Sequence, residues 1–274
     1  MQHFLREGER LDDLERNRLK IIQDPKRFCF GMDAVLLSGM VKVPDGGRVI
    51  DLGTGTGILP LLLSAKTGAS ELIGLEIQEE SADMARRSVA VNVVSGALEP
   101  AGSEKAADCM GNGNPRQTGN YPEAKRIRIV TGDLKEATAL FGRGIFDAVT
   151  ANPPYMEGGT GIANPGDAKA IARHELLCTF RDVAREAAGL LKPGGHFYLV
   201  HRPHRLAELI TTLTECRLEP KVMQLVYPSA EKEPNMVLLD CVKGGGRFLT
   251  VREPLIIFGE DGKYTETVRE LYGF

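Results

Sequence analysis

The sequence lacks paired cysteines, a long apolar run and an excess of charge of one sign. Its five cysteines are odd in number and scattered without a CxxC spacing, which argues against a disulfide framework and against a metal site. Thiols that stay reduced are typical of the cytosol, so we expect a cytoplasmic protein. These residues are Cys29, Cys109, Cys178, Cys216 and Cys241.

Membrane insertion and export are also not expected. No uninterrupted apolar stretch is long enough to span a bilayer. The segment from Met1 to Arg18 is crowded with charges and lacks the apolar core of a signal peptide. The formal net charge of -3 argues against a surface that is a nucleic-acid footprint throughout, although it allows a local basic patch.

Short apolar runs alternate with helical patterns from Arg48 to Arg202, which is typical of a parallel α/β sheet. A chain of 274 residues is long enough to form one such domain around a large core. The expected strands are 49–50, 71–75, 127–130, 145–150 and 196–200. The expected helices are 58–66, 79–94 and an amphipathic stretch with Ile171, Leu176, Phe180, Val183, Ala187 and Leu191 near one face, closed by KPGG at 192–195.

Two regions differ from this alternation. Runs 221–227 and 236–242 flank a polar turn and predict an antiparallel pair added to the parallel sheet, followed by a strand-like run at 255–258 and a short helix near Tyr264. Residues 95–125 are rich in Gly, Asn, Pro and Ser without apolar periodicity. We expect this segment to be a disordered insertion; a functional lid is the alternative.

The segment VIDLGTGTG (49–57) stands where the first strand turns into the first helix. Gly53, Gly55 and Gly57 allow a tight turn and close approach of a ligand, while the helix N-terminus offers N–H groups. Glu76 follows at the end of the second strand, where a carboxylate can accept both hydroxyl hydrogens of a ribose. The alternative for Glu76 is a solvated carboxylate at a strand end.

Two details favour S-adenosylmethionine over a nicotinamide cofactor. The spacing is GxGxG rather than GxGxxG, and Asp51 stands two residues before the first glycine. S-adenosylmethionine has a ribose and an adenine but no pyrophosphate to bind. Asp133, in TGDL after the third strand, is placed to accept a hydrogen bond from the adenine amino group. It is also a good N-cap for the helix that follows, and both roles stay open.

The segment TANPPY (150–155) follows the fourth strand. Pro153 restricts Asn152 to extended backbone angles, and neither proline carries an N–H donor. The Asn152 side-chain oxygen and the Pro153 carbonyl can therefore accept both hydrogens of a flat amino group, on which Tyr155 can stack. A sulfonium methyl needs only positioning for in-line attack, so we expect no dedicated general base. A proline-rich strand exit is the alternative.

Together these motifs resemble the NPPY-type class I methyltransferases, which methylate exocyclic or amide nitrogens. More narrowly, the chain resembles the bacterial tRNA adenine-N6 methyltransferases that act on a valine tRNA at the adenine 3′ of the anticodon. The resemblance covers nearly the whole chain except 95–125. It is carried by segments 9–41, 49–63, 74–93, 128–134, 151–155, 171–209 and 254–272.

The resemblance implies one Rossmann-like domain over 1–274, with a seven-stranded, mainly parallel sheet, the last strand antiparallel and helices on both faces. It implies that the extension 1–47 packs over the cofactor site and that FCFGMD (28–33) lines the methionine end of S-adenosylmethionine. Phe30, Gly31 and Asp33 are the expected contacts there. A tRNA is the implied partner, without a metal or a membrane.

Other functions compete with this prediction. Glutamine-N5 methylation of a release factor presents the same amide geometry to NPPY, and adenine-N6 methylation of rRNA uses the same chemistry. A nicotinamide-dependent oxidoreductase leaves NPPY unexplained, and nothing indicates a non-catalytic RNA-binding module with a decayed pocket. Cations that could contact RNA are Lys26 with Arg27, Arg173, and Arg202 with Arg205, unless they form an ordinary solvated face.

Overall fold

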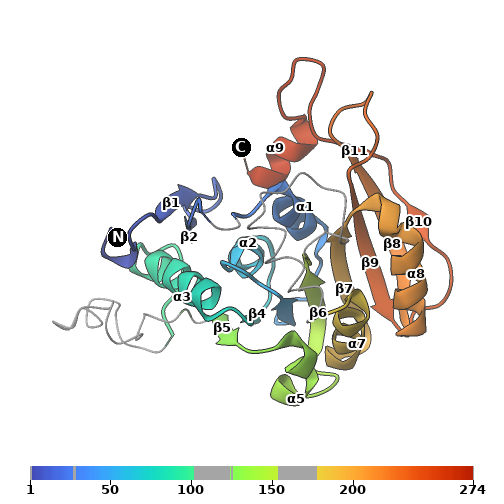
Figure 1. Ribbon diagram of the computed structural model, residues 1–274, viewed down its shortest axis with the longest axis horizontal. Coiled ribbons are helices and arrows are strands. Elements are labelled where there is room, and N and C mark those ends of the chain that lie inside the picture. Colours follow the sequence, from blue (N-terminus) through green and yellow to red (C-terminus); the bar gives the residue numbers. More distant parts are fainter. Residues whose placement is uncertain (1, 27–28, 102–123, 125, 154–177, 274) are drawn as a thin grey trace.

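The computed structural model describes residues 2–26, 29–101, 124, 126–153 and 178–273. Figure 1 shows a central sheet with helices packed on both sides, as the α/β alternation predicts. No helix in the described parts of the chain is both long enough and apolar enough to cross a membrane.

The elements follow one another in mixed α/β order. The strands are β1 (Arg10–Asp13), β2 (Lys20–Gln23), β3 (Arg48–Leu52), β4 (Glu71–Glu76), β5 (Ile127–Thr131), β6 (Phe146–Ala151), β7 (Leu191–His201), β8 (Leu218–Tyr227), β9 (Met236–Lys243), β10 (Thr250–Val251) and β11 (Leu255–Ile256). The α-helices are α1 (Met32–Met40), α2 (Ile58–Lys66), α3 (Glu79–Val94), α5 (Ala137–Phe141), α7 (Phe180–Leu190), α8 (Leu206–Glu215) and α9 (Glu266–Tyr272). Short 3-10 turns are η1 (Gln2–Phe4), η3 (Leu134–Glu136) and η4 (Pro203–Arg205).

The main sheet has the order β5-β4-β3-β6-β7-β9-β8. Neighbours from β5 to β7 pair in parallel, whereas β9 is antiparallel to both β7 and β8. The seven-stranded body with an antiparallel last strand is therefore confirmed. The short strands β10 and β11 add two parallel pairings on β8 and make the sheet nine-stranded.

Helix α8 is absent from the predicted elements. It follows β7 and returns the chain, so that β8 runs in the same direction as β7 and β9 can insert between them. Its buried residues are Leu209, Thr212 and Leu213. A short helix with one narrow apolar face gives a weak periodic signal.

Both faces of the sheet are covered, which explains its near-continuous apolar strands. On β3, Val49 packs into the cluster beneath α1 and α2, while its neighbour Ile50 packs into the cluster beneath α7 and α8. The predicted bounds of α2 and α3 are confirmed to the residue.

The predicted end of the amphipathic helix at KPGG is wrong. The described helix α7 begins after the Thr179 cap, whose hydroxyl and backbone exchange hydrogen bonds with Asp182, and it ends at Leu190. Leu191 instead starts β7 opposite Phe146, and KPGG forms an irregularity in that strand, with Gly194 at φ 76°. Ile171 and Leu176 lie outside the described residues.

The N-terminal hairpin of β1 and β2 is held by side chains of α3. The Asn92 amide accepts from Lys20 N at 2.8 Å and donates to Lys20 O at 2.6 Å, and Ser88 Oγ accepts from Ile22 N at 2.9 Å. Helix side chains thus take the place of a neighbouring strand for β2. Packing of 1–47 over a cofactor stays a prediction, and so does disorder of 95–125, most of which lies outside the described residues.

A buried charge cluster anchors the chain start to α3. The Arg87 guanidinium donates to both Glu9 carboxylate oxygens at 2.5 and 2.7 Å and to Asp83 at 2.8 Å. The side chains of Arg87 and Glu9 are only 3% and 6% exposed.

We expect Arg87→Met to lower the free energy of unfolding by about 3–5 kcal/mol, because it leaves the Glu9 carboxylate buried and unpaired. Urea unfolding monitored by circular dichroism measures the loss. The control Arg181→Met removes an exposed pair with Glu215 and should cost less than about 1 kcal/mol. Equal losses in the two variants would contradict the prediction.

Candidate functional site

The carboxyl ends of β3, β4, β5 and β6 bring four predicted motifs to one edge of the sheet. The chain order reverses between β3 and β6, and in open α/β sheets ligands bind at such a switch point. In the register, Asp51 lies opposite Gly74 on one side and Thr150 on the other. Glu76 pairs with Thr131, so TGDL starts at the same edge.

The glycine loop after β3 has a backbone that only glycine adopts readily. Gly53, Gly55 and Gly57 have φ values of 74°, 57° and 85°. A Cβ on Gly53 or Gly55 would meet nothing within 4 Å, so the loop backbone faces open space. A Cβ on Gly57 would lie 3.1 Å from the Ala85 Cβ, so this glycine also permits close packing of α3 on the N-cap of α2.

Glu76 fixes the loop from the neighbouring strand. Its Oε2 accepts from Gly55 N at 2.9 Å and its Oε1 accepts from Gln78 N at 2.8 Å. The residue is 6% exposed, so the alternative of a solvated carboxylate is wrong. A carboxylate offers about four acceptor positions, and capacity for the two hydroxyls of a ribose remains.

Asp51 is buried beside the loop with one oxygen unpaired. Thr150 Oγ1 donates to Asp51 Oδ1 at 2.6 Å, whereas Asp51 Oδ2 has no hydrogen-bond partner among the described residues. Burial raises the pKa of Asp51 to about 6, against the opposing effects of the Thr150 and Thr54 hydroxyls beside it. A buried acceptor without a donor fits the ammonium group of a methionine moiety.

Two threonines beside Asp51 were not predicted from the sequence. Thr150 is completely buried within an apolar strand, and the hydroxyl of Thr54 is also buried without a partner in the described structure. Gly74 makes room for Thr54, because a Cβ there would lie 2.7 Å from Thr54 Cγ2. A polar residue in the middle of an apolar run was the available signal for Thr150.

Asp133 caps the turn that follows β5. Its side chain accepts from Lys135 N at 2.9 Å, so the capping interpretation is confirmed. The side chain is 32% exposed, and its role toward an adenine stays a prediction.

The residues expected at the methionine end lie at the start of α1. Asp33 is 7% exposed and accepts from Ala34 N at 2.8 Å, while Phe30 N donates to the Gln23 side-chain oxygen at 2.9 Å. A Cβ on Gly31 would stand 2.9 Å from Asp33 Oδ1, so a larger residue there would disturb that carboxylate. Contact of these residues with a cofactor stays a prediction.

Asn152 and Pro153 follow directly after β6, on the strand next to the glycine loop. Both residues are partly exposed. Their place at a strand end beside Asp51 and Thr150 is the arrangement that the NPPY interpretation requires. Tyr155, the third predicted catalytic residue, lies outside the described residues.

The residues at the end of β7 are engaged within the protein. His201 is buried, which lowers the pKa of its imidazole to about 4, and its Nδ1 accepts from Arg202 N at 2.7 Å. Arg202 Nη1 donates to Asn235 O at 2.8 Å, and Arg205 donates to both Glu208 oxygens at 2.9 and 2.6 Å. These pairings disfavour Arg202 and Arg205 as a freely available RNA patch.

The structure gives little information on the other cations that were predicted to contact RNA. Arg27 and Arg173 lie outside the described residues, and Lys26 is exposed. No group of three or more potential metal ligands occurs in the described ranges.

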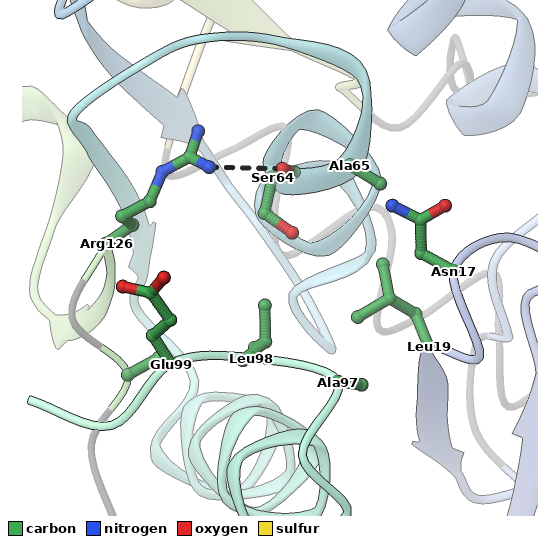
Figure 2. A pocket seen from close by; sticks show the side chains of 9 residues that line it. Asn17, Leu19, Ser64, Ala65, Ala97, Leu98, Glu99 and Arg126 are labelled. Carbon is green, nitrogen blue, oxygen red and sulfur yellow. Dashed lines mark hydrogen bonds between the residues drawn. The ribbon is translucent and has the colours of Figure 1, made fainter.

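A cavity of about 210 Å³ lies away from these motifs. Figure 2 shows its lining between the end of α2, the segment after α3 and the turn before β2, with Arg126 Nη1 donating to Ser64 O at 3.3 Å. Because Arg126 precedes β5, the cavity is at the amino edge of the parallel strands, opposite to the glycine loop. It is not part of the candidate site.

The strand order and the glycine loop after β3 are those of the class I methyltransferase fold. The fold matches a predicted O-methyltransferase from Agrobacterium tumefaciens with a TM-score of 0.64 and 24% identity, covering 88% of this chain and 95% of that one. It also matches P. horikoshii TYW2 in complex with MeSAdo, with a TM-score of 0.55, 14% identity and coverage of 88% and 73%. At these identities the likeness shows the fold alone.

The names of curated relatives specify an activity. A tRNA1(Val) (adenine(37)-N6)-methyltransferase of Aeromonas salmonicida is 26% identical over 88% of this chain and 87% of its own length. One of the same name from Porphyromonas gingivalis is 26% identical over 81% and 77%. The profile of the ribosomal protein L11 methyltransferase (PrmA) matches residues 34–110. The resemblance seen in the sequence is thereby confirmed.

Asp51 should couple stability to pH. Its pKa is 3.8 when unfolded and about 6 when folded, so folding favours the protonated form and stability falls as pH rises from 3.8 through about 6. We expect Asp51→Asn to raise the free energy of unfolding at about pH 8 by about 1–3 kcal/mol and to weaken S-adenosylmethionine binding.

Urea unfolding and titration calorimetry measure the two effects. At about pH 4 most of the stability advantage should vanish, because Asp51 of the unsubstituted protein is then largely protonated in the folded state. An advantage of the same size at both pH values would contradict the assignment.

Proposed function

We propose that the chain transfers a methyl group from S-adenosylmethionine to N6 of an adenine in tRNA, next to the anticodon of a valine tRNA. The observation that carries the proposal is the position of Asn152 and Pro153 on the strand adjacent to the glycine loop. The names of the relatives, which specify adenine 37 of tRNA1(Val), support the choice of acceptor. A cytoplasmic location goes with such a substrate.

The residues at the strand ends fit S-adenosylmethionine. The open space over Gly53 and Gly55 admits a ligand to the loop backbone, and the unpaired Asp51 Oδ2 offers an acceptor for its ammonium group. Glu76 would hold the ribose hydroxyls and Asp133 the adenine amino group. Phe30 and Asp33 would line the methionine end. When bound, the cofactor supplies an electrophilic methyl group on a sulfonium.

The protein then has to hold the acceptor nitrogen in line. The Asn152 side-chain oxygen and the Pro153 carbonyl accept its two hydrogens, which draws the nitrogen toward tetrahedral geometry and directs its lone pair to the methyl carbon. Tyr155 stacks on the flat ring. The methylated nitrogen becomes acidic and loses its proton to water, so no side chain has to act as a base.

The layout of the chain extends the proposal. The domain spans 1–274 and the extension 1–47 packs over the cofactor site. An unpaired adenine in a loop costs less to turn into a pocket than a paired one.

Incubation with labelled S-adenosylmethionine and separate pools of tRNA, rRNA, release factor and ribosomal protein tests the acceptor. The ribosomal protein is included because of the profile match at 34–110. We expect label in tRNA, at an adenine that digestion identifies as N6-methyladenine. Label entering protein alone would rule out the tRNA proposal.

Asn152→Ala should retain cofactor affinity and lower the rate of methyl transfer by about a hundredfold or more, because an acceptor used during transfer is lost. Calorimetry with S-adenosylmethionine and single-turnover kinetics on tRNA separate the two effects. A collapse of cofactor affinity would show that Asn152 serves the cofactor and not the acceptor.

A further inference from the structure

The C-terminal segment after β11 has no part in the site described above. It forms a loop that closes with a bridge between Phe258 and Tyr264 and continues into α9, which packs against α1. Figure 1 shows α9 and this loop at one end of the molecule, above α1 and β11. Three aromatic side chains from this segment lie together.

The three rings form a nearly parallel series. Phe258 and Tyr264 have ring centroids 5.2 Å apart with planes inclined by 22°, and Tyr264 and Tyr272 are 5.6 Å apart with planes inclined by 11°. Phe258 is 38% exposed, although a phenyl ring is normally covered. An exposed ring at the end of such a series is a surface on which a nucleobase can stack.

A hollow of about 360 Å³ adjoins this series. It is lined by Asp261, Lys263, Tyr264 and Arg269. The Lys263 side chain is 83% exposed and only 4.0 Å from the Asp261 carboxylate, which makes a weak ion pair. The exposed Arg269 guanidinium has no ion pair within the described residues, so two cations are available to a phosphate.

The hollow lies at the same sheet edge as Asn152. Strand β11 pairs with Val226 and Tyr227 at the carboxyl end of β8, and β8 runs in the same direction as β6. Strand β11 lies one strand beyond β8, so four strand spacings, or about 19 Å, separate it from β6 across the sheet. A few unpaired nucleotides can span that distance.

The aromatic series also packs against the core cluster that contains α1. Burial raises the pKa of the Tyr272 phenol to about 12, with Tyr264 and the Asp33 carboxylate adding to the effect. Helix α9, which ends at Tyr272, packs against α1, and Asp33, one of the residues expected at the methionine end of the cofactor, lies in the first turn of α1. Arg269 of the hollow thus belongs to a helix that packs against α1.

We propose that Phe258 and the adjoining hollow bind an unpaired nucleotide of the RNA substrate close to the target adenine. Its base stacks on Phe258, its phosphate lies between Lys263 and Arg269, and Asp261 accepts a hydrogen from a base amino group. The inference rests on the proposed function, because it assumes an RNA acceptor. It adds a substrate-binding role for the C-terminal segment.

The test uses the full chain and a fluorescently labelled anticodon stem-loop RNA. We expect Phe258→Ala to weaken RNA binding, measured by fluorescence anisotropy, about tenfold, and to raise KM for the RNA similarly. Phe258→Tyr should keep nearly full affinity, because it retains the ring. Lys263→Ala and Arg269→Ala should each weaken binding and reduce its dependence on salt.

Phe248→Ala is the matched control. Phe248 is 88% exposed just before β10, where its loss removes an apolar ring away from the hollow, and it should leave RNA affinity unchanged. Cofactor affinity, measured by calorimetry, should be the same in all of these variants. Loss of cofactor affinity together with RNA affinity would overturn the inference, because it would indicate disturbed packing of α9.

The outcomes separate the two proposals. If the unsubstituted protein methylates tRNA and the Phe258, Lys263 and Arg269 variants bind RNA as well as it does, the nucleotide site is wrong and the proposed function stands. If the unsubstituted protein methylates a protein and no RNA, the proposed function fails and the nucleotide site falls with it.

Discussion

The hydrogen bond from Gly55 N to the Glu76 carboxylate joins the two halves of the candidate cofactor site. It ties the glycine loop after β3 to the end of β4, and the Leu75 carbonyl accepts from Gly53 N and Thr54 N beside it. These three hydrogen bonds fix the backbone of the loop. A preformed loop lowers the ordering cost of binding, because its backbone is already in place.

The glycine loop and the strand ends beside it contain buried polar groups that lower the stability of the fold. Asp51 is buried with one unpaired oxygen, and Thr54 has a buried hydroxyl without a partner in the described residues. Buried polar groups without partners are rare in proteins and concentrate where a ligand completes them. The core beneath α1 and α2 and the core beneath α7 and α8 supply the stability against which this cost is set.

Specific polar contacts attach the segments at both ends of the chain to the rest of the domain. Asn92 and Ser88 of α3 bind the β2 backbone, and Arg87 holds the preceding segment through Glu9. At the other end, Arg16 Nη1 donates to the carbonyls of Glu270 and Leu271 at the end of α9. The extension and the C-terminal helix therefore meet beside α1, at whose start Asp33 lies.

The sequence by itself determined the alternation of strands and helices, the bounds of α2 and α3, and the motifs that meet at the strand ends. Periodicity and glycine spacing are local properties, so they can be recognised in the sequence without a structure. Only the tertiary structure decided that Glu76 is buried against Gly55, that Thr150 binds Asp51, and that KPGG interrupts β7 and does not end α7. Those features depend on which strands become neighbours and in which register, and local sequence does not encode a pairing partner.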